Sequence, residues 1–158
     1  MNEVTARGWT IRPVRPDDAP ALRRMREEAG WDVEKVPAWI AASLSGDRPT
    51  WVAELDGEAV GMVSLELRDS DPEVADGNGV AAVTSLSVLA SAARRGIGRA
   101  LTVFVEQQAR GRGIRVLTLN TRPKNEAAVA LYEALGYQRW KEQERPWGLA
   151  VYLRKSLG

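Results

Sequence analysis

The residues with the clearest capacity for chemistry lie within Ala93–Leu101, where two glycines and three arginines occur within six positions. Gly96 and Gly98 stand between an apolar run that predicts a strand, Val83–Val88, and a pattern with helical spacing. Backbone N–H groups at a helix start lack intrahelical partners and carry partial positive charge. Because glycine has no Cβ, an anion can approach this backbone closely. The turn therefore predicts a cradle for phosphate or pyrophosphate.

Two well-known phosphate motifs do not match this turn. A dinucleotide-binding turn needs a third glycine where Leu101 stands. It also needs an acidic residue about 20 residues later, where Asn120 and Thr121 stand. A nucleoside triphosphate loop needs Gly-Lys-Ser/Thr, which is absent. The plain alternative is a tight connection that carries surface arginines.

A second motif follows at Asn125–Tyr137, which reads Asn-Glu-Ala-Ala-Val-Ala-Leu-Tyr-Glu-Ala-Leu-Gly-Tyr. Together the two stretches resemble the GNAT superfamily of acetyl-CoA-dependent N-acetyltransferases. The first motif of that family runs Gln/Arg-x-x-Gly-x-Gly/Ala, and the second runs Asn-x-x-Ala-x-x-Leu-Tyr followed by Gly-Phe/Tyr. Both occur here in the family's order, over about residues 80–140. Ala93 departs from the pattern, because the family prefers Gln or Arg there.

The resemblance implies the fold. We expect an α/β (α+β) chain with a GNAT-like mixed, mostly antiparallel central sheet of six to seven strands. The sheet would contain a splayed parallel pair, and about four helices would flank it. Residues 1–158 would form a single N-acetyltransferase domain, a usual size for one domain.

The resemblance also implies acetyl-CoA as co-substrate. The end of the Val83–Val88 strand would pair with the pantetheine arm like an added strand, and the amides of the turn would hold the pyrophosphate. Asn125 would hydrogen-bond the arm, and Tyr132 would protonate the departing thiolate, although Tyr132 also fits a core aromatic. The residues expected to bind the cofactor are Leu86, Ser87, Val88, Arg94, Arg95, Gly96, Ile97, Gly98, Arg99, Ala100, Asn125 and Tyr132.

The general base is less evident from the sequence. Many family members carry a glutamate where this chain has Thr84 and Ser85, and neither residue is a base at neutral pH. Glu66, on the preceding predicted strand, is the best candidate and would act through water. The alternative is that no dedicated base exists and that an already deprotonated amine is captured.

Composition limits the chemistry. The chain of 158 residues has no cysteine and no histidine, so it has neither a thiolate nucleophile nor an imidazole base, and we expect no metal site. Residues 1–79 carry 9 basic and 16 acidic side chains, whereas residues 80–158 carry 13 and 5. This asymmetry suits an anionic cofactor and a cationic acceptor, or it reflects solvated faces alone. The basic residues do not form the aromatic-interleaved pattern of nucleic-acid binding.

Two further features have a functional and a plain interpretation. The loop 68–79 holds Asp69, Asp71, Glu73 and Asp76; it could attract a cationic amine, or it is a solvated surface loop. Trp31 and Trp39 could touch the acceptor, or they pack in the core or under a lid.

Periodicity and turn residues predict the remaining elements. Asp56-Gly57 between apolar runs predicts a hairpin, and Gly61 in its second strand indicates a bulge or a close backbone approach. Asp17 or Asp18 would cap the first helix. The other expected strands are Trp9–Pro13, Val116–Asn120, Tyr137–Gln143 and Gly148–Arg154, and the other expected helices are 19–28, 36–44 and the one that opens at Asn125.

The resemblance implies an N-acetyltransferase that moves an acetyl group to a primary amine of a small molecule, peptide or protein by direct attack in a ternary complex. The alternatives are a non-catalytic CoA or acyl-CoA sensor and a nucleotide-binding protein. We expect acetyl-CoA and an amine acceptor as partners, with neither nucleic acid nor membrane. A cytoplasmic location is expected, and a homodimer is one assembly the sequence leaves open.

Overall fold

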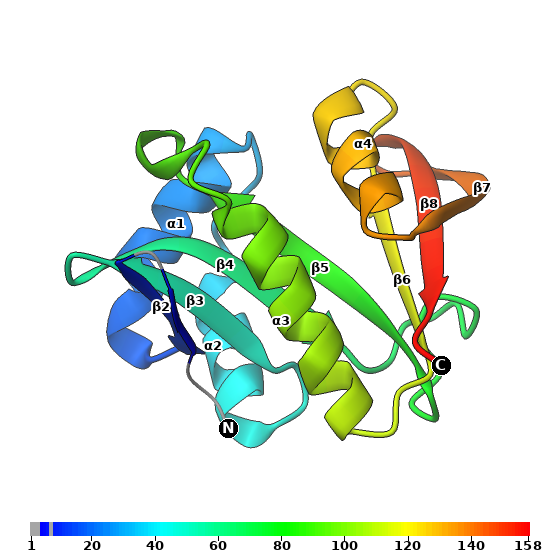
Figure 1. The fold of residues 1–158 in the computed structure, drawn as a ribbon, viewed down its shortest axis with the longest axis horizontal. Helices are drawn as coiled ribbons and strands as arrows, with labels where there is room; N and C mark the ends of the chain where they lie inside the picture. Colours follow the sequence, from blue (N-terminus) through cyan, green and yellow to red (C-terminus); the bar gives the residue numbers. More distant parts are fainter. Residues whose placement is uncertain (1–3, 7) are drawn as a thin grey trace. The chain divides into compact units, whose positions relative to one another are not determined.

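The computed structural model describes residues 4–6 and 8–158 (Figure 1). Their strands and α-helices are β1 (Val4–Ala6), β2 (Trp9–Pro13), α1 (Ala19–Glu28), α2 (Val36–Ser45), β3 (Thr50–Leu55), β4 (Glu58–Glu66), β5 (Val80–Val88), α3 (Ile97–Gly111), β6 (Val116–Thr121), α4 (Glu126–Ala134), β7 (Gln138–Arg145) and β8 (Gly148–Ser156). The chain divides into two compact units. Unit 1 comprises Met1–Glu66 and Ser85–Val105, and unit 2 comprises Leu67–Thr84 and Glu106–Gly158.

Unit 1 contains an antiparallel series of strands, β1-β2-β3-β4, with α1, α2, the end of β5 and the start of α3. Asp56 and Gly57 connect β3 to β4, and both have positive φ angles, 52° and 82°. Two consecutive positive φ angles define the hairpin turn that matches strand twist. The predicted hairpin is therefore confirmed, and it fixes the register of β4.

Gly61 shows which face of β4 meets α3. A Cβ on Gly61 would lie 3.1 Å from Cγ2 of Ile97 and 3.2 Å from Cδ1 of Leu101, so the helix approaches the bare backbone closely. The β3–β4 register also shifts beside Gly61, between Ala53 and Glu54. Both features that the sequence indicated at this glycine are therefore present. Because side chains alternate along a strand, Ser64 and Glu66 lie on the face opposite α3.

A buried ion pair ties β2 to the start of α1. Nη1 and Nη2 of Arg12 donate to the two carboxylate oxygens of Asp18, each over 2.9 Å, and Arg12 Nε donates to Glu54 over 2.9 Å. Asp18 also accepts from the amide of Arg15 at 2.7 Å. The expected side-chain cap of α1 by Asp18 is wrong, because the carboxylate is used by Arg12 and by the preceding turn.

Unit 2 contains the start of β5 with β6, β8 and β7, in that hydrogen-bonded order. The first strands, β5 and β6, are parallel, whereas β6–β8 and β7–β8 are antiparallel. Its hydrophobic cluster joins the loop after β4 to the last strand, and the half-buried Trp140 and Trp147 pack against it. The cluster residues are Val74, Ala75, Ala82, Ala150 and Tyr152.

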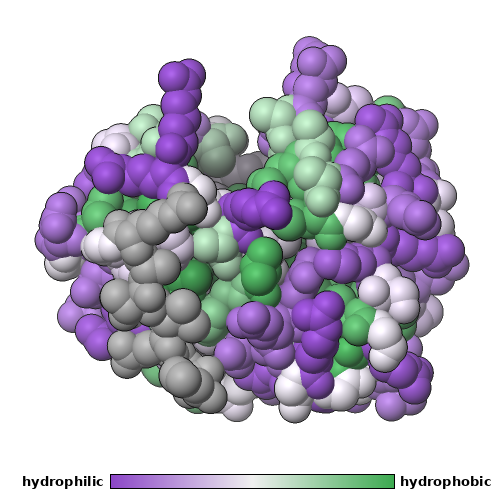
Figure 2. Space-filling model, viewed as in Figure 1, coloured by the Kyte–Doolittle hydropathy of each residue, from purple (hydrophilic) through white to green (hydrophobic). Residues whose placement is uncertain are grey.

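The predicted mixed, mostly antiparallel fold with one parallel pair and four helices is confirmed. The described residues contain eight strands rather than six to seven, and the strand that the sequence did not indicate is the three-residue β1. The other differences are small shifts in bounds. For example, β5 begins three residues earlier than predicted, at Val80. Figure 2 shows that this face of the molecule is mainly hydrophilic, with hydrophobic residues in separate areas.

Candidate functional site

The turn before α3 has the backbone of an anion-binding nest. Arg94 and Gly96 have left-handed φ angles, 65° and 80°, and Arg95 between them does not. Such alternation directs successive amides toward one side of the chain. Ala100 N donates to Gly96 O over 3.0 Å, which is the first i→i−4 hydrogen bond of the helix. The amides of residues 97–99 therefore lie in the first turn, where no backbone partner within the helix is available. The turn thus offers uncommitted amides, as the glycine pattern predicted.

The side chains of the turn are arranged to receive a ligand. Ile97 is 1% exposed and anchors the turn in the core of unit 1. A Cβ on Gly98 would lie 3.9 Å from Cγ2 of Val88 and would meet nothing closer, so the space beside this glycine is open. The three arginines, Arg94, Arg95 and Arg99, are exposed, and no ion pair or hydrogen bond joins them to the described part of the chain. Open backbone and free cations together fit a diphosphate.

The strand that leads to this turn pairs with its parallel neighbour over only part of its length. The parallel ladder of β5 with β6 covers three pairs and ends at Ala82–Thr118, although both strands continue. Ser85 has a φ angle of 57°, a left-handed conformation inside a strand. The following residues, Leu86, Ser87 and Val88, are half-buried. A parallel pair that stops pairing early is the splay expected of the family.

Tyr132 and Asn125 belong to unit 2, whereas the turn belongs to unit 1. Tyr132 is 7% exposed, and burial raises its pKa to about 12, so its hydroxyl stays protonated at neutral pH. Oδ1 of Asn125 accepts from Ala128 N over 3.3 Å, which caps α4. Asn125 therefore has a structural role in addition to the expected cofactor contact, for which its side-chain N–H groups remain the donors.

Glu66, the candidate base, lies at the end of β4 on the face opposite α3. Its negative charge acts on the guanidinium of Arg48, which lies in the turn between α2 and β3. Nη2 of Arg48 donates to Oγ of Ser85 over 3.1 Å. The structure thus adds Arg48 to the site. The sequence identifies only a turn there, because the residues that Arg48 contacts are distant along the chain.

The acidic loop after β4 makes hydrogen bonds within unit 2, although Glu73 and Asp76 are exposed. Nζ of Lys141 on β7 donates to Asp71 over 2.8 Å and to Glu73 over 3.3 Å. The carboxylate of Asp76 accepts from the amides of Asn78 and Val80. These carboxylates fold the loop onto unit 2.

Trp31 and Trp39 are half-buried and lie beside arginines. The Cζ atom of Arg26 is 5.6 Å from the Trp31 ring centroid and 4.6 Å from that of Trp39. Cζ of Arg48 is 4.2 Å from the Trp39 centroid. Neither tryptophan belongs to the fully buried core. Both therefore remain candidates to contact the acceptor.

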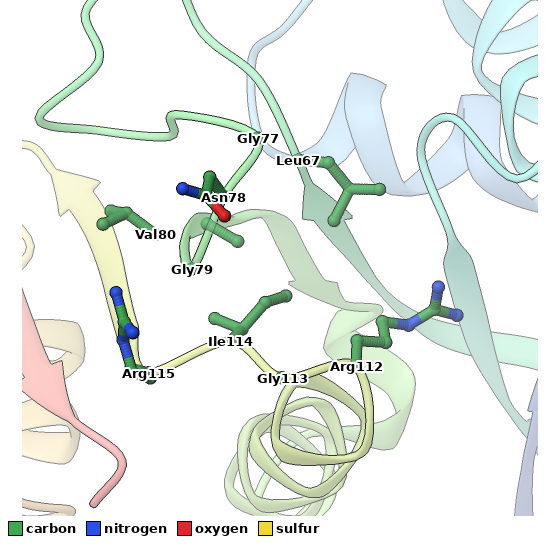
Figure 3. A pocket seen from close by; sticks show the side chains of 10 residues that line it. Leu67, Gly77, Asn78, Gly79, Val80, Arg112, Gly113, Ile114 and Arg115 are labelled. Carbon is green, nitrogen blue, oxygen red and sulfur yellow. The ribbon is translucent and has the colours of Figure 1, made fainter.

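A separate cavity of about 300 Å³ lies within unit 2, at the start of β5 and β6 (Figure 3). Figure 3 shows Arg112 and Arg115 on opposite sides of it, with Ile114 between them. It adjoins the amino ends of two parallel strands, whereas ligands of such sheets bind at the carboxyl ends. The turn at Gly96 therefore remains the better cofactor site.

Within residues 4–6 and 8–158, no group of three or more metal-ligating side chains is close enough together to hold an ion. No helix in the same residues is both long and apolar enough to cross a membrane.

Comparison with known proteins agrees with this geometry. Residues 16–137 match the model of the acetyltransferase (GNAT) family. An aminoglycoside N(6')-acetyltransferase type 1 from Klebsiella aerogenes is 35% identical over 80% of this chain and 88% of its own length. A mycothiol acetyltransferase from Acidothermus cellulolyticus is 30% identical over 83% of this chain, and the match spans 44% of that protein. The crystal structure of Arabidopsis thaliana NAA60 in complex with acetyl-CoA has a TM-score of 0.76 and 18% identity, covering 94% of this chain and 98% of that one.

The chain therefore belongs to the GNAT acetyltransferase family, and it is an acetyl-CoA-dependent N-acetyltransferase. The similarity to NAA60 supports the fold alone, because the sequence identity is low. The comparisons give no support to a non-catalytic sensor.

Proposed function

We propose that this enzyme transfers the acetyl group of acetyl-CoA directly to a primary amine within a ternary complex. The observation that carries this proposal is the turn at Gly96 and Gly98, where left-handed backbone, first-turn amides and free arginines coincide. The amides of Arg95–Arg99 hold the pyrophosphate, and Arg94, Arg95 and Arg99 add charge. Leu86–Val88 pair with the pantetheine arm as an added strand.

The chain's own groups position the reactants and move two protons. The amine nitrogen attacks the thioester carbonyl carbon; a C–N bond forms and the C–S bond breaks. A backbone N–H near Leu86 stabilises the developing oxyanion. The departing sulfur takes its proton from the hydroxyl of Tyr132, and the nitrogen loses one to Glu66 through water. No protein nucleophile takes part, which agrees with a chain that has no cysteine.

Support for the role of Tyr132 comes from its place in the second sequence motif and from its burial, and its hydroxyl is protonated at neutral pH. Support for Glu66 comes from its place on the face opposite α3, together with Arg48. The relatives named above are an aminoglycoside N(6')-acetyltransferase and a mycothiol acetyltransferase, so they do not point to one acceptor. The acceptor class proposed at this level is thus a primary amine of a small molecule or of a peptide.

A thiol-release assay with acetyl-CoA and a panel of primary amines tests the proposal, with mass spectrometry of the products. We expect release of CoA that depends on the amine and appearance of the N-acetylated amine. Binding of CoA without turnover of any amine would instead support a sensor. Thermal protection by ATP or NAD, without protection by CoA, would support a nucleotide-binding protein.

We also propose that both units form one N-acetyltransferase domain, because the matched residues 16–137 draw on both. A homodimer and a cytoplasmic location remain predictions from the sequence. Sedimentation equilibrium tests the first, and cell fractionation tests the second.

A further inference from the structure

The loop that leads from β5 to the turn at Gly96 is held at its first two residues. The amide of Leu89 donates to the carbonyl of Val60 on β4 over 2.8 Å, and the Leu89 side chain is buried. The amide of Ala90 donates to Oε1 of Glu28 over 3.0 Å. Glu28 is the last residue of α1, 62 positions earlier in the chain, and Figure 1 shows this loop beside α1. The loop is therefore tied to β4 by its backbone and to α1 by one side chain.

Residues 90–92 form a short 3₁₀ turn that has no cap of its own. Its N-cap position is Leu89, whose side chain has no hydrogen-bonding atom, and no side-chain cap is formed there. The first amides of a helical turn lack partners within the turn. The carboxylate of Glu28 accepts from one of them, that of Ala90, although it belongs to another element. Glu28 thus does for this loop what an N-cap residue does within a helix.

Glu28 is not placed where a carboxylate stabilises its own helix. The C-terminal end of a helix carries partial negative charge, so an acidic side chain there is unfavourable. Backbone groups close the end of α1 instead: the amide of Ala29 donates to Met25 O over 3.1 Å, and Gly30 follows with a φ angle of 80°. The hydrogen bond to Ala90 is therefore the contact that accounts for a carboxylate at this position.

The 3₁₀ turn passes directly into the cradle. Three residues separate Ala90 from Arg94, where the left-handed backbone begins. Within this stretch Ala92 is 1% exposed, and Ala93 N donates to Ala90 O over 3.2 Å. A displacement of Ala90 would therefore turn the amides of Arg95–Arg99. Hydrogen bonds weaken steeply when donor and acceptor are misaligned, so these amides would hold a diphosphate less well.

We propose that Glu28 is a positioning residue for acetyl-CoA. By accepting the hydrogen bond from Ala90, it holds the loop so that the amides of the turn at Gly96 face the pyrophosphate. It acts through the loop and contacts neither the cofactor nor the reacting atoms. This inference rests on the proposed acetyltransferase function and adds to it a residue outside both sequence motifs. Because the loop needs only an oxygen acceptor, an amide side chain at this position should serve as well.

Calorimetric titration with CoA tests the inference through binding, without turnover. Glu28→Ala removes the acceptor, and we expect it to weaken CoA binding by about 3- to 10-fold, the range of one net hydrogen bond. Glu28→Gln keeps an oxygen acceptor and should bind CoA within about twofold of the parent enzyme. Two results would overturn the inference: Glu28→Ala binding CoA as tightly as the parent, or Glu28→Gln binding it as weakly as Glu28→Ala.

Glu27→Ala is the matched control. Glu27 lies in the same last turn of α1 and is exposed, and in the described part of the chain its carboxylate makes no hydrogen bond or ion pair. The variant removes the same charge from the same end of the helix, so it should bind CoA like the parent. An equal change in both alanine variants would mean that the charge, and not the hydrogen bond, acts on the cofactor, and would contradict the inference.

Steady-state kinetics separate this role from general stabilisation of the fold. At saturating acetyl-CoA the ligand itself holds the loop, so kcat of Glu28→Ala should stay within about twofold of the parent while KM for acetyl-CoA rises. The urea concentration at the midpoint of unfolding should change little. A fall in kcat and in that midpoint, with KM for acetyl-CoA unchanged, would indicate a general structural role and contradict the inference.

The failure of this inference differs from failure of the proposed function. If the parent enzyme binds CoA and Glu28→Ala binds it equally well, the function stands and the role of Glu28 falls. If the parent binds no CoA and acetylates no amine, the proposed function falls and the inference falls with it.

Discussion

The ring of Tyr132 meets the ring of Tyr137 edge-on, with centroids 6.0 Å apart and planes at 62°. The amide of Tyr137 also donates to the carbonyl of Tyr132 over 3.0 Å. Both rings are buried, with 7% and 2% exposure. The end of the second sequence motif thus holds the ring of the proposed general acid in one orientation.

Tyr132→Phe should remove the proton donor and leave the packing intact. We expect kcat to fall by about 10²-fold or more, with KM for acetyl-CoA within about twofold, because the hydroxyl acts mainly on the leaving thiolate. Steady-state thiol release measures both constants. A kcat close to that of the parent enzyme would exclude Tyr132 as the acid.

Tyr137→Phe is the matched control, and its outcome follows from burial. The Tyr137 hydroxyl and Oε2 of Glu106 are buried without a hydrogen-bond partner among residues 4–6 and 8–158. Removal of an unsatisfied hydroxyl costs little or stabilises the fold. We expect kcat to be unchanged and the free energy of unfolding to be equal or up to about 1 kcal/mol higher. Urea denaturation checks the second expectation, and a clear loss of stability would mean that the hydroxyl is bonded in solution.

The pH dependence of kcat follows from the raised pKa of Tyr132. A general acid works only while protonated, so the rate should fall only when the pH approaches about 12. Between neutral pH and about pH 10, we expect no descending limb from this group. A descending limb at about pH 10 that is absent in Tyr132→Phe would show that burial has not raised the pKa of this tyrosine.

Glu66→Gln tests the base. If Glu66 accepts the amine proton through water, the variant should lose the ascending limb of kcat/KM against pH and about 10²-fold in rate. Identical profiles for parent and variant would leave capture of a free amine as the mechanism. Glu58→Gln, an exposed residue at the other end of β4, is the control.

Gly98→Ala tests the cradle without disturbing the fold. The added Cβ would meet Val88 at an ordinary 3.9 Å, so the free energy of unfolding should stay the same or rise by about 1 kcal/mol. The methyl group would occupy the space proposed for the pyrophosphate, and acetyl-CoA should bind about tenfold more weakly or worse. Gly111→Ala, at the end of the same helix with nothing within 4 Å, is the control. Equal affinity in both variants, measured by calorimetry, would argue against the cradle.

Asp18 should make the free energy of unfolding depend on pH in the acid range. Burial alone would raise its pKa, but hydrogen bonds from the Arg12 side chain and the Arg15 amide outweigh this effect, and the pKa is lowered. A lowered folded-state pKa stabilises the fold above the unfolded value of about 3.9, and this stability is lost as the pH falls below it. Asp18→Asn should lower the free energy of unfolding by about 3 kcal/mol at pH 7. It should also weaken the dependence of that free energy on pH in the acid range.

The control for that variant is Asp32→Asn. Asp32 is 60% exposed and 3.9 Å from its partner Arg26, so it should change the free energy of unfolding by under about 0.5 kcal/mol. Urea titrations at neutral and acid pH compare the two variants. If the free energy of unfolding changes with pH in the same way in both variants, the Arg12–Asp18 pair is not the cause of the loss of stability in acid.

The sequence pattern predicted correctly those features that depend only on residues adjacent in the chain. Asp56-Gly57 specified its turn because few residues tolerate two positive φ angles, and Gly96 marked a left-handed position before a helix. The cradle could be found in this way because its residues are consecutive.

Contacts between distant residues could not be predicted. Arg48 and Ser85 are 37 positions apart, and only the folded strands bring them together. Lys141 contacts Asp71 from 70 positions away, so no local pattern indicates this ion pair. Asp18 looked like a helix cap because sequence spacing carries no information about the competing Arg12.

The most direct measurement is an NMR titration of the ¹⁵N-labelled protein with CoA, because it follows each backbone amide. The largest saturable shifts should belong to the amides of Arg95–Arg99, with further shifts at Leu86–Val88. Shifts confined to Gly77–Gly79 and Arg115, around the cavity of unit 2, would place the ligand elsewhere and contradict the account.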